Sequence, residues 1–145
     1  MVGGTARDAL AAVDTDGTLL PWNPGAGYPV AALAMSGSAI FIGGSQFNTV
    51  AGAKRNYAAA VDTNGGILSW NPRPNSSVNA LAVSGTKVFV GGVFDTIGGV
   101  ERSKLAAFDS SGALLNWNPD VTEYLYATAS INALATSDTT LYAGG

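Results

Sequence analysis

The chain contains no cysteine and no histidine. Without cysteine it can form no disulfide, no thiolate nucleophile and no cysteine-ligated metal site. Without histidine it lacks imidazole acid–base catalysis, Ser-His-Asp chemistry and histidine-ligated metals. These two absences remove the commonest catalytic and metal-binding constellations, so we expect no metal, no cofactor and no enzymatic activity.

Charge is also scarce, since 12% of the 145 residues are charged, about half of the usual quarter. The seven basic residues are scattered and the net charge is −3, so no basic stripe is present to neutralise phosphates. No apolar run approaches the roughly 18 residues of a membrane-spanning helix, and residues 1–8 lack the pattern of a secretory signal. We therefore expect no binding to nucleic acid or membrane, and no targeting signal in this chain.

What the chain does contain is an internal repeat, which should be sought first because it decides the fold. The motif Trp-Asn-Pro begins at Trp22, Trp70 and Trp117, with spacings of 48 and 47 residues. Four other features repeat with it: an arginine, an aspartate that closes an Ala-Ala-apolar-Asp motif, the start of an apolar-x-Ala-Leu-Ala motif, and a double glycine. They fall at Arg7, Arg55 and Arg102; at Asp14, Asp62 and Asp109; at Val30, Val78 and Ile131; and at 43–44, 91–92 and 144–145.

Within the second copy, alternating apolar residues and turn signals predict four short strands. They are Val78–Val83, Lys87–Phe94, Lys104–Phe108 and Ala113–Trp117. The double glycine inside the second strand indicates a bulge or the close approach of another backbone. Four antiparallel strands in 40 to 50 residues are typical of a β-propeller blade. The fold class we predict is all-β, a propeller with three four-stranded blades per chain.

The repeated motifs Gly-Gly-x-Phe, Arg-x-x-x-Ala-Ala-x-Asp, Trp-Asn-Pro and Val-x-Ala-Leu-Ala resemble the delta-60 type repeat β-propellers. This is a largely bacterial group of propeller repeats with no assigned general function. The resemblance covers nearly the whole chain. It implies a scaffold architecture and no particular activity.

The order of the motifs divides the chain into two whole blades, 25–72 and 73–119, and two half blades, 1–24 and 120–145. The first half blade supplies strands three and four, and the last supplies strands one and two. Three blades are too few to close, because propellers usually have four to eight. We predict a homodimer in which strands pair between chains to complete a six-bladed ring. A compatible alternative is that the chain is a natural or engineered piece of a larger propeller.

The repeated side chains have structural and functional interpretations. Each tryptophan could stack on a sugar, although packing between adjacent blades is favoured. Each arginine could bind an anion, although a bond to a turn carbonyl or to the repeated aspartate is favoured. The stretch Asp14-Thr15-Asp16-Gly17 is similar to the start of a calcium loop, but no glutamate follows at the required distance in any copy. Hairpin turns are the favoured interpretation of all three aspartates.

One connection departs from the repeat. Eight residues separate the tryptophan from the next apolar-x-Ala-Leu-Ala motif in two copies, and fourteen separate Trp117 from Ile131. Insertions in repeat proteins fall in loops, often on the binding face. We therefore predict a ligand site in the longer loop at 120–130, for a carbohydrate or a protein, or else merely a tolerated extra length. The candidate ligand-binding residues are Asp120, Glu123, Tyr124 and Tyr126.

Together these patterns predict a non-catalytic scaffold or interaction module that self-associates, in an extracellular or cell-surface protein of bacterial type. Two alternatives stay open. One is an enzyme fragment of glycosidase or lyase type with a site on the propeller face, because glycosidases need only two carboxylates. The other is an engineered or truncated repeat fragment with no ligand.

Overall fold

The computed structural model describes residues 1–121 and 129–145, and in these residues the chain is all-β without a helix. The strands form two three-stranded and three two-stranded antiparallel sheets, none of them closed. Their bounds are β1 Val30–Ser36, β2 Ala39–Gly44, β3 Thr49–Val50, β4 Ala53–Lys54, β5 Ala58–Asp62, β6 Val78–Ser84, β7 Lys87–Gly92, β8 Thr96–Ile97, β9 Val100–Glu101, β10 Leu105–Phe108, β11 Ala133–Ser137 and β12 Thr140–Gly144.

The two larger sheets are built alike, which confirms the repeat as a structural unit. The first sheet has the order β1-β2-β5, and the second sheet has the order β6-β7-β10. Phe41 of β2 lies opposite Ala60 of β5, and Phe89 of β7 lies opposite Ala107 of β10 at the same place in the repeat. A small hairpin follows the middle strand each time, β3-β4 in the first sheet and β8-β9 in the second.

The predicted fourth strand is not formed as a strand. Instead of joining the second sheet along Ala113–Trp117, this segment makes a single bridge, between Phe108 and Leu114. Two backbone hydrogen bonds hold it beside β10, from the Asp109 N–H to the Ala113 carbonyl and from the Leu115 N–H to the Ala107 carbonyl. The Leu115 carbonyl accepts a hydrogen bond from the Arg102 guanidinium at 3.1 Å. Each larger sheet therefore has three strands plus one bridged segment.

The double glycines lie where one sheet approaches the next. A Cβ atom on Gly43 would be 2.5 Å from Cγ1 of Val78 in the second sheet, and one on Gly91 would be 2.5 Å from Cγ2 of Ile131. Both features predicted for this position, the close approach of another backbone and a bulge, are present. The bulge is a register shift in the strand that pairs with each double glycine, between Val30 and Ala32 in β1 and likewise in β6. Glycine is therefore required here for sheet-to-sheet contact rather than for an unusual φ.

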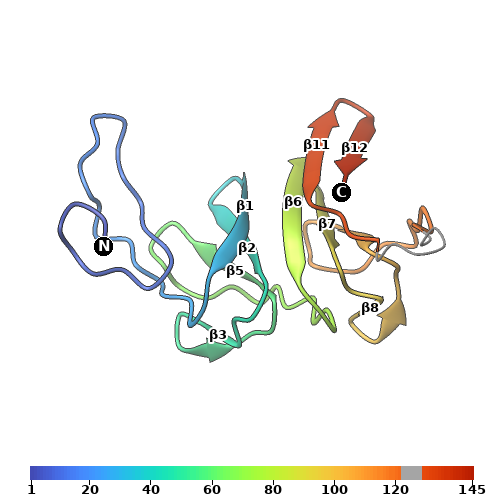
Figure 1. The fold of residues 1–145 in the computed structure, drawn as a ribbon. Helices are drawn as coiled ribbons and strands as arrows, with labels where there is room; N and C mark the ends of the chain where they lie inside the picture. Colours follow the sequence, from blue (N-terminus) through green and yellow to red (C-terminus); the bar gives the residue numbers. More distant parts are fainter. Residues whose placement is uncertain (122–128) are drawn as a thin grey trace.

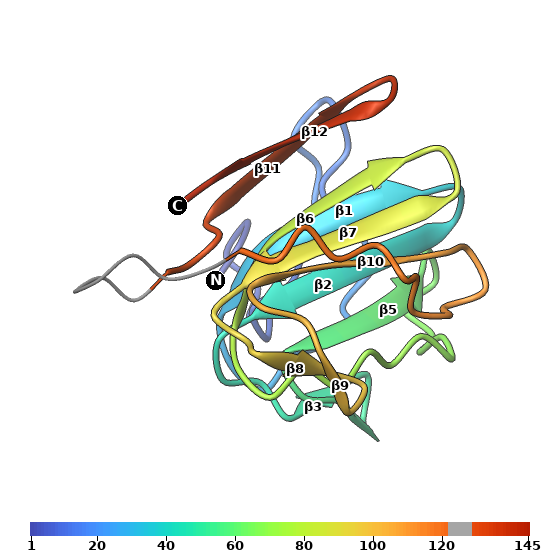
Figure 2. The same cartoon turned by 90° about the vertical axis from the view of Figure 1, so that its right-hand side faces the viewer.

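The sheets stand side by side. In Figure 1 the N-terminal segment, β1, β6 and β11 follow one another across the molecule, and β6 contacts both β1 and β11. Figure 2, turned by 90°, shows the hairpin β11-β12 above β6 in that view. The largest core cluster fills the space between the two larger sheets and includes Phe41, Trp70 and Phe108. Burial is thus deepest at the contact between neighbouring repeats.

We expect Gly91→Ala to destabilise the fold by about 1 to 3 kcal/mol, the usual cost of extra volume in a packed interior. The free energy of unfolding is measured by urea denaturation. Ile131→Ala removes the Cγ2 atom that the new methyl group would meet, so in the double variant the two effects should be less than additive. Full additivity would show that the two positions do not touch.

Candidate functional site

The candidate loop site is only partly within the described residues. Glu123, Tyr124 and Tyr126 lie outside them. Asp120 is described and exposed, with a left-handed φ of 52°. The residues at the same place in the other copies share this conformation, Gly25 with a φ of 65° and Arg73 with a φ of 51°. Asp120 therefore occupies a backbone position of the repeated turn.

The three tryptophans differ sharply in exposure. Trp70 is 7% exposed and makes edge-to-face contacts with Phe41 of β2 and Phe108 of β10, at centroid distances of 5.1 and 5.6 Å. It therefore packs between neighbouring sheets, as the favoured interpretation predicted, and its ring is not available for a sugar. Trp117 contacts Phe89 at 5.4 Å and is 38% exposed.

The arginines bind backbone carbonyls rather than the repeated aspartates. In every copy Nη2 donates to the carbonyl thirteen residues later, at 3.1, 3.0 and 3.1 Å for Arg7, Arg55 and Arg102. Nη1 donates to the preceding carbonyl in each case. These guanidinium groups hold the end of the bridged segment, which is the turn-carbonyl role expected for them.

The repeated aspartates organise hairpin turns. Oδ1 of Asp109 accepts hydrogen bonds from the backbone N–H groups of Ser111 and Ala113, both at 2.9 Å, and from the Ser111 hydroxyl at 2.6 Å. Asp14 and Asp62 accept two backbone N–H groups each in the same pattern. The hairpin interpretation is confirmed, because each aspartate accepts backbone N–H groups two and four residues further along the chain.

The hydroxyl of Ser111, and after it the N–H of Ala113, lower the pKa of the Asp109 carboxyl below its ordinary value of 3.8. Hydrogen bonds to a carboxylate favour its ionised form.

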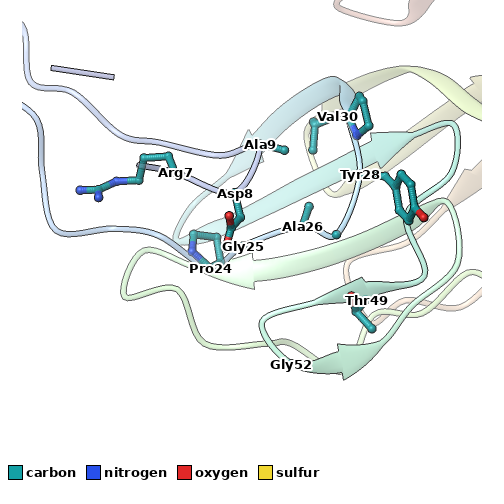
Figure 3. Close-up of a pocket in the computed structure, with 12 residues that line it drawn as sticks. Arg7, Asp8, Ala9, Pro24, Gly25, Ala26, Tyr28, Val30, Thr49 and Gly52 are labelled. Carbon is teal, nitrogen blue, oxygen red and sulfur yellow. The ribbon is translucent and has the colours of Figure 1, made fainter. Parts of the chain in front are cut away.

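A shallow hollow of about 800 Å³ lies beside the N-terminal segment. Figure 3 shows Asp8, Pro24 and Gly25 on one side of it and Tyr28 and Thr49 on the other, with the side chain of Arg7 pointing away from Tyr28. Asp8 is the one carboxylate among its lining residues. The hollow is formed largely by turn backbone, so no motif in the sequence indicated it, and it does not assemble paired carboxylates.

Two other classes of site were tested in the same part of the chain. Residues 1–121 and 129–145 hold no cluster of three or more aspartate, glutamate, histidine or cysteine side chains able to bind a metal. Within these same ranges no helix is long and apolar enough to cross a membrane.

The structure does present two unpartnered surfaces at opposite ends. The first is the N-terminal hairpin, residues 10–22, in which the Leu20 N–H donates to the Ala12 carbonyl at 2.9 Å. The same bond occurs in the larger sheets, from Leu68 to Ala60 and from Leu115 to Ala107. In the described residues, however, this hairpin has no second strand beside it. Val13, at its centre, is 53% exposed.

An apolar groove runs between this hairpin and the first sheet. It has a volume of about 460 Å³, and none of its lining residues is charged. The large side chains of this apolar groove are Leu20, Trp22, Leu33, Met35 and Ile40. Leu33 and Met35 are more than half exposed, which is unusual for side chains of this size on a sheet face.

The second surface is the outer edge of β12. Whereas β2 and β7 each pair on both sides, β12 pairs with β11 alone among the described residues. Tyr142 projects from this strand and is 59% exposed, while Phe41 and Phe89 at the same place in the other copies are buried. Sequence reasoning identified the complementary half repeats but not this groove or this tyrosine. Comparing exposure across equivalent positions is the signal that finds them.

Comparisons with known proteins add little. No family model and no curated protein sequence matches the chain. Among solved structures it is similar to two computationally designed proteins, Ika8 and Ika4. Ika8 is 17% identical with a TM-score of 0.43, covering 97% of this chain and 53% of that one. Ika4 is 18% identical with a TM-score of 0.39, covering 79% of this chain and 84% of that one. This chain thus spans about half the length of Ika8.

We expect the Asp109 carboxyl to titrate with a midpoint below 3.8 in a carbon-detected NMR titration, since its pKa is lowered in the fold. Ser111→Ala removes the largest cause and should move the midpoint toward 3.8. Because the folded pKa is the lower one, the stabilisation by this turn is present above about pH 3.8 and is lost as pH falls through the folded pKa. An unchanged midpoint in Ser111→Ala would refute the assigned cause.

Proposed function

We propose that the chain is a non-catalytic β-propeller scaffold or interaction module, which self-associates by adding a strand of one copy to a sheet of another. The observation that supports this most directly is the pair of incomplete units. The hairpin β11-β12 has the first two strands of the repeat, and the N-terminal hairpin has the hydrogen bonds of the last two. Each contains what the other lacks.

The internal repeat defines the register of the proposed pairing. In the first sheet Phe41 lies opposite Ala60, and Ile40 lies opposite Val61. Transferred to the ends of two copies, this register places Tyr142 opposite Ala12 and Leu141 opposite Val13. An open strand edge favours association with another strand, and this pairing would cover the edge of β12.

A symmetric pair of chains would contain six repeats, a number within the usual range of propeller blades. Two-fold symmetry uses each incomplete unit twice, so both ends of both chains would be covered. The apolar exposure of Val13, Trp117 and Tyr142 supports such a pairing, because large apolar patches on a soluble protein mark interaction sites. The functional unit we propose is therefore the closed ring, and partners would bind to its faces.

The mass in solution tests the association directly. At micromolar concentration we expect light scattering after size exclusion to give twice the 14.6 kDa mass of the chain. A mass of 14.6 kDa at all accessible concentrations would contradict the proposal. A mass of three or more chains would contradict the six-repeat ring but not strand addition itself.

Cysteine cross-linking tests the register, and the absence of native cysteine removes any background. Two singly substituted chains, Leu141→Cys and Val13→Cys, are mixed under oxidising conditions. Because paired strands place opposite Cα atoms about 4.5 to 5.5 Å apart, within the range of a disulfide, we expect a covalent dimer on a non-reducing gel. Ala12→Cys replaces Val13→Cys as the control, since its side chain points to the other face. Equal cross-linking with both would exclude the proposed register.

A further inference from the structure

The contact between neighbouring sheets has one constant feature, a glycine of one repeat against a β-branched residue of the next. Gly43 meets Val78, and Gly91 meets Ile131, each so closely that an added Cβ would be 2.5 Å from a methyl group. At the third equivalent position, Gly144, an added Cβ would meet no atom of the described residues within 4 Å. The remaining β-branched residue of this series is Val30, which begins the first sheet. One glycine and one valine are thus left without their counterparts.

An aromatic residue accompanies this contact in each copy. Phe41 lies within a core cluster that contains Trp70, Leu81 and Val88, with Leu68 and Val83 packed against it. The counterparts of these five residues one repeat earlier are Trp22, Leu33, Ile40, Leu20 and Met35. They are the large side chains that line the apolar groove. The positions that line the apolar groove are therefore the counterparts of those that surround Phe41. The ring that corresponds to Phe41 itself is not in the apolar groove.

We infer that a second copy of this chain fills the apolar groove, with its Tyr142 ring packed against Trp22 and its Gly144 packed against Val30. This inference rests on the proposed self-association and specifies the face-to-face contacts that accompany strand pairing. The interface continues the one that joins the first and second sheets within a chain. A partner of other chemistry would need neither the repeat register nor the glycine.

The opposite side of the same interface also has space for a side chain of the second copy. A hollow of about 630 Å³ is lined by Trp117 and Phe89 of the second repeat and by Leu141 of β12. In the equivalent place between the larger sheets, Phe108 packs edge-on against Trp70. The counterpart of Phe108 is Val13, so Val13 of the second copy occupies this hollow beside Trp117.

Gly144→Val is the decisive variant, because a Cβ added at Gly144 meets no atom of the described residues within 4 Å in a single chain, whereas the inferred interface has no room for it. We expect unchanged circular dichroism and a dissociation constant of the dimer raised by about tenfold or more, from the overpacking cost converted to affinity. Sedimentation velocity over a dilution series measures this constant. Val30→Ala in the same chain removes the facing methyl groups and should recover part of the affinity.

Tyr142 provides a second and independent measurement. Tyr142→Ala removes a ring that is mostly exposed in the single chain, so we expect weaker association without loss of the fold. Tyr142→Phe is the matched control. It should associate about as strongly as the unsubstituted chain, because phenylalanine occupies both equivalent positions.

The possible outcomes separate the two proposals. If the dimer forms and cross-links at positions 13 and 141, but Gly144→Val and Tyr142→Ala leave its dissociation constant unchanged, the inferred packing is wrong and strand addition stands. If the unsubstituted chain is monomeric, the proposed self-association itself is wrong. If Gly144→Val unfolds the chain, the comparison of Tyr142→Ala with Tyr142→Phe decides: equal dissociation constants would overturn the inference.

Discussion

The sheets assemble through contacts between a glycine of one sheet and a β-branched residue of the next repeat. Gly43 on Val78 and Gly91 on Ile131 bring neighbouring sheets to the same close distance. That approach lets Trp70 beside the first larger sheet reach Phe108 of the second, so the aromatic contact between repeats depends on it. A larger side chain at either glycine would separate the sheets and open this core. The arginine and aspartate bonds, by contrast, act within one repeat and fix the turns that deliver the strands.

Much of the fold could be predicted from the sequence, because each copy of the repeat shows the same pattern independently. The strands around Ala80 and Ala106, the turn at Asp109 and the packing role of Trp70 follow from spacing, alternation and turn chemistry. The predicted fourth strand was wrong. Apolar alternation at Ala113–Trp117 indicates a strand, but the segment makes a single bridge to β10, and its Leu115 carbonyl accepts a hydrogen bond from the Arg102 guanidinium.

The candidate surfaces were harder to predict, since they depend on which residues lack a neighbour. Tyr142 and Trp22 are ordinary repeat positions in the sequence, and their exposure becomes visible only when the sheets are placed in space. The candidate loop was chosen for its extra length, and Asp120 proved to hold a position of the repeated turn. Local periodicity therefore predicts what repeats share, whereas the differences between equivalent positions need the packed structure.

The left-handed residue that follows each Asn-Pro pair has a consequence for how such chains can change. Asp120 has the same left-handed backbone conformation as Gly25 and Arg73. The connection that follows it is nevertheless six residues longer than in the other two copies. Ile131 still packs on Gly91 after that longer connection. The turn thus fixes where one repeat ends, and the contact between Gly91 and Ile131 fixes where the next repeat begins. A joint of this kind separates loop length from sheet geometry, which makes it a natural graft point for foreign segments and a place where variety can accumulate while the scaffold is preserved.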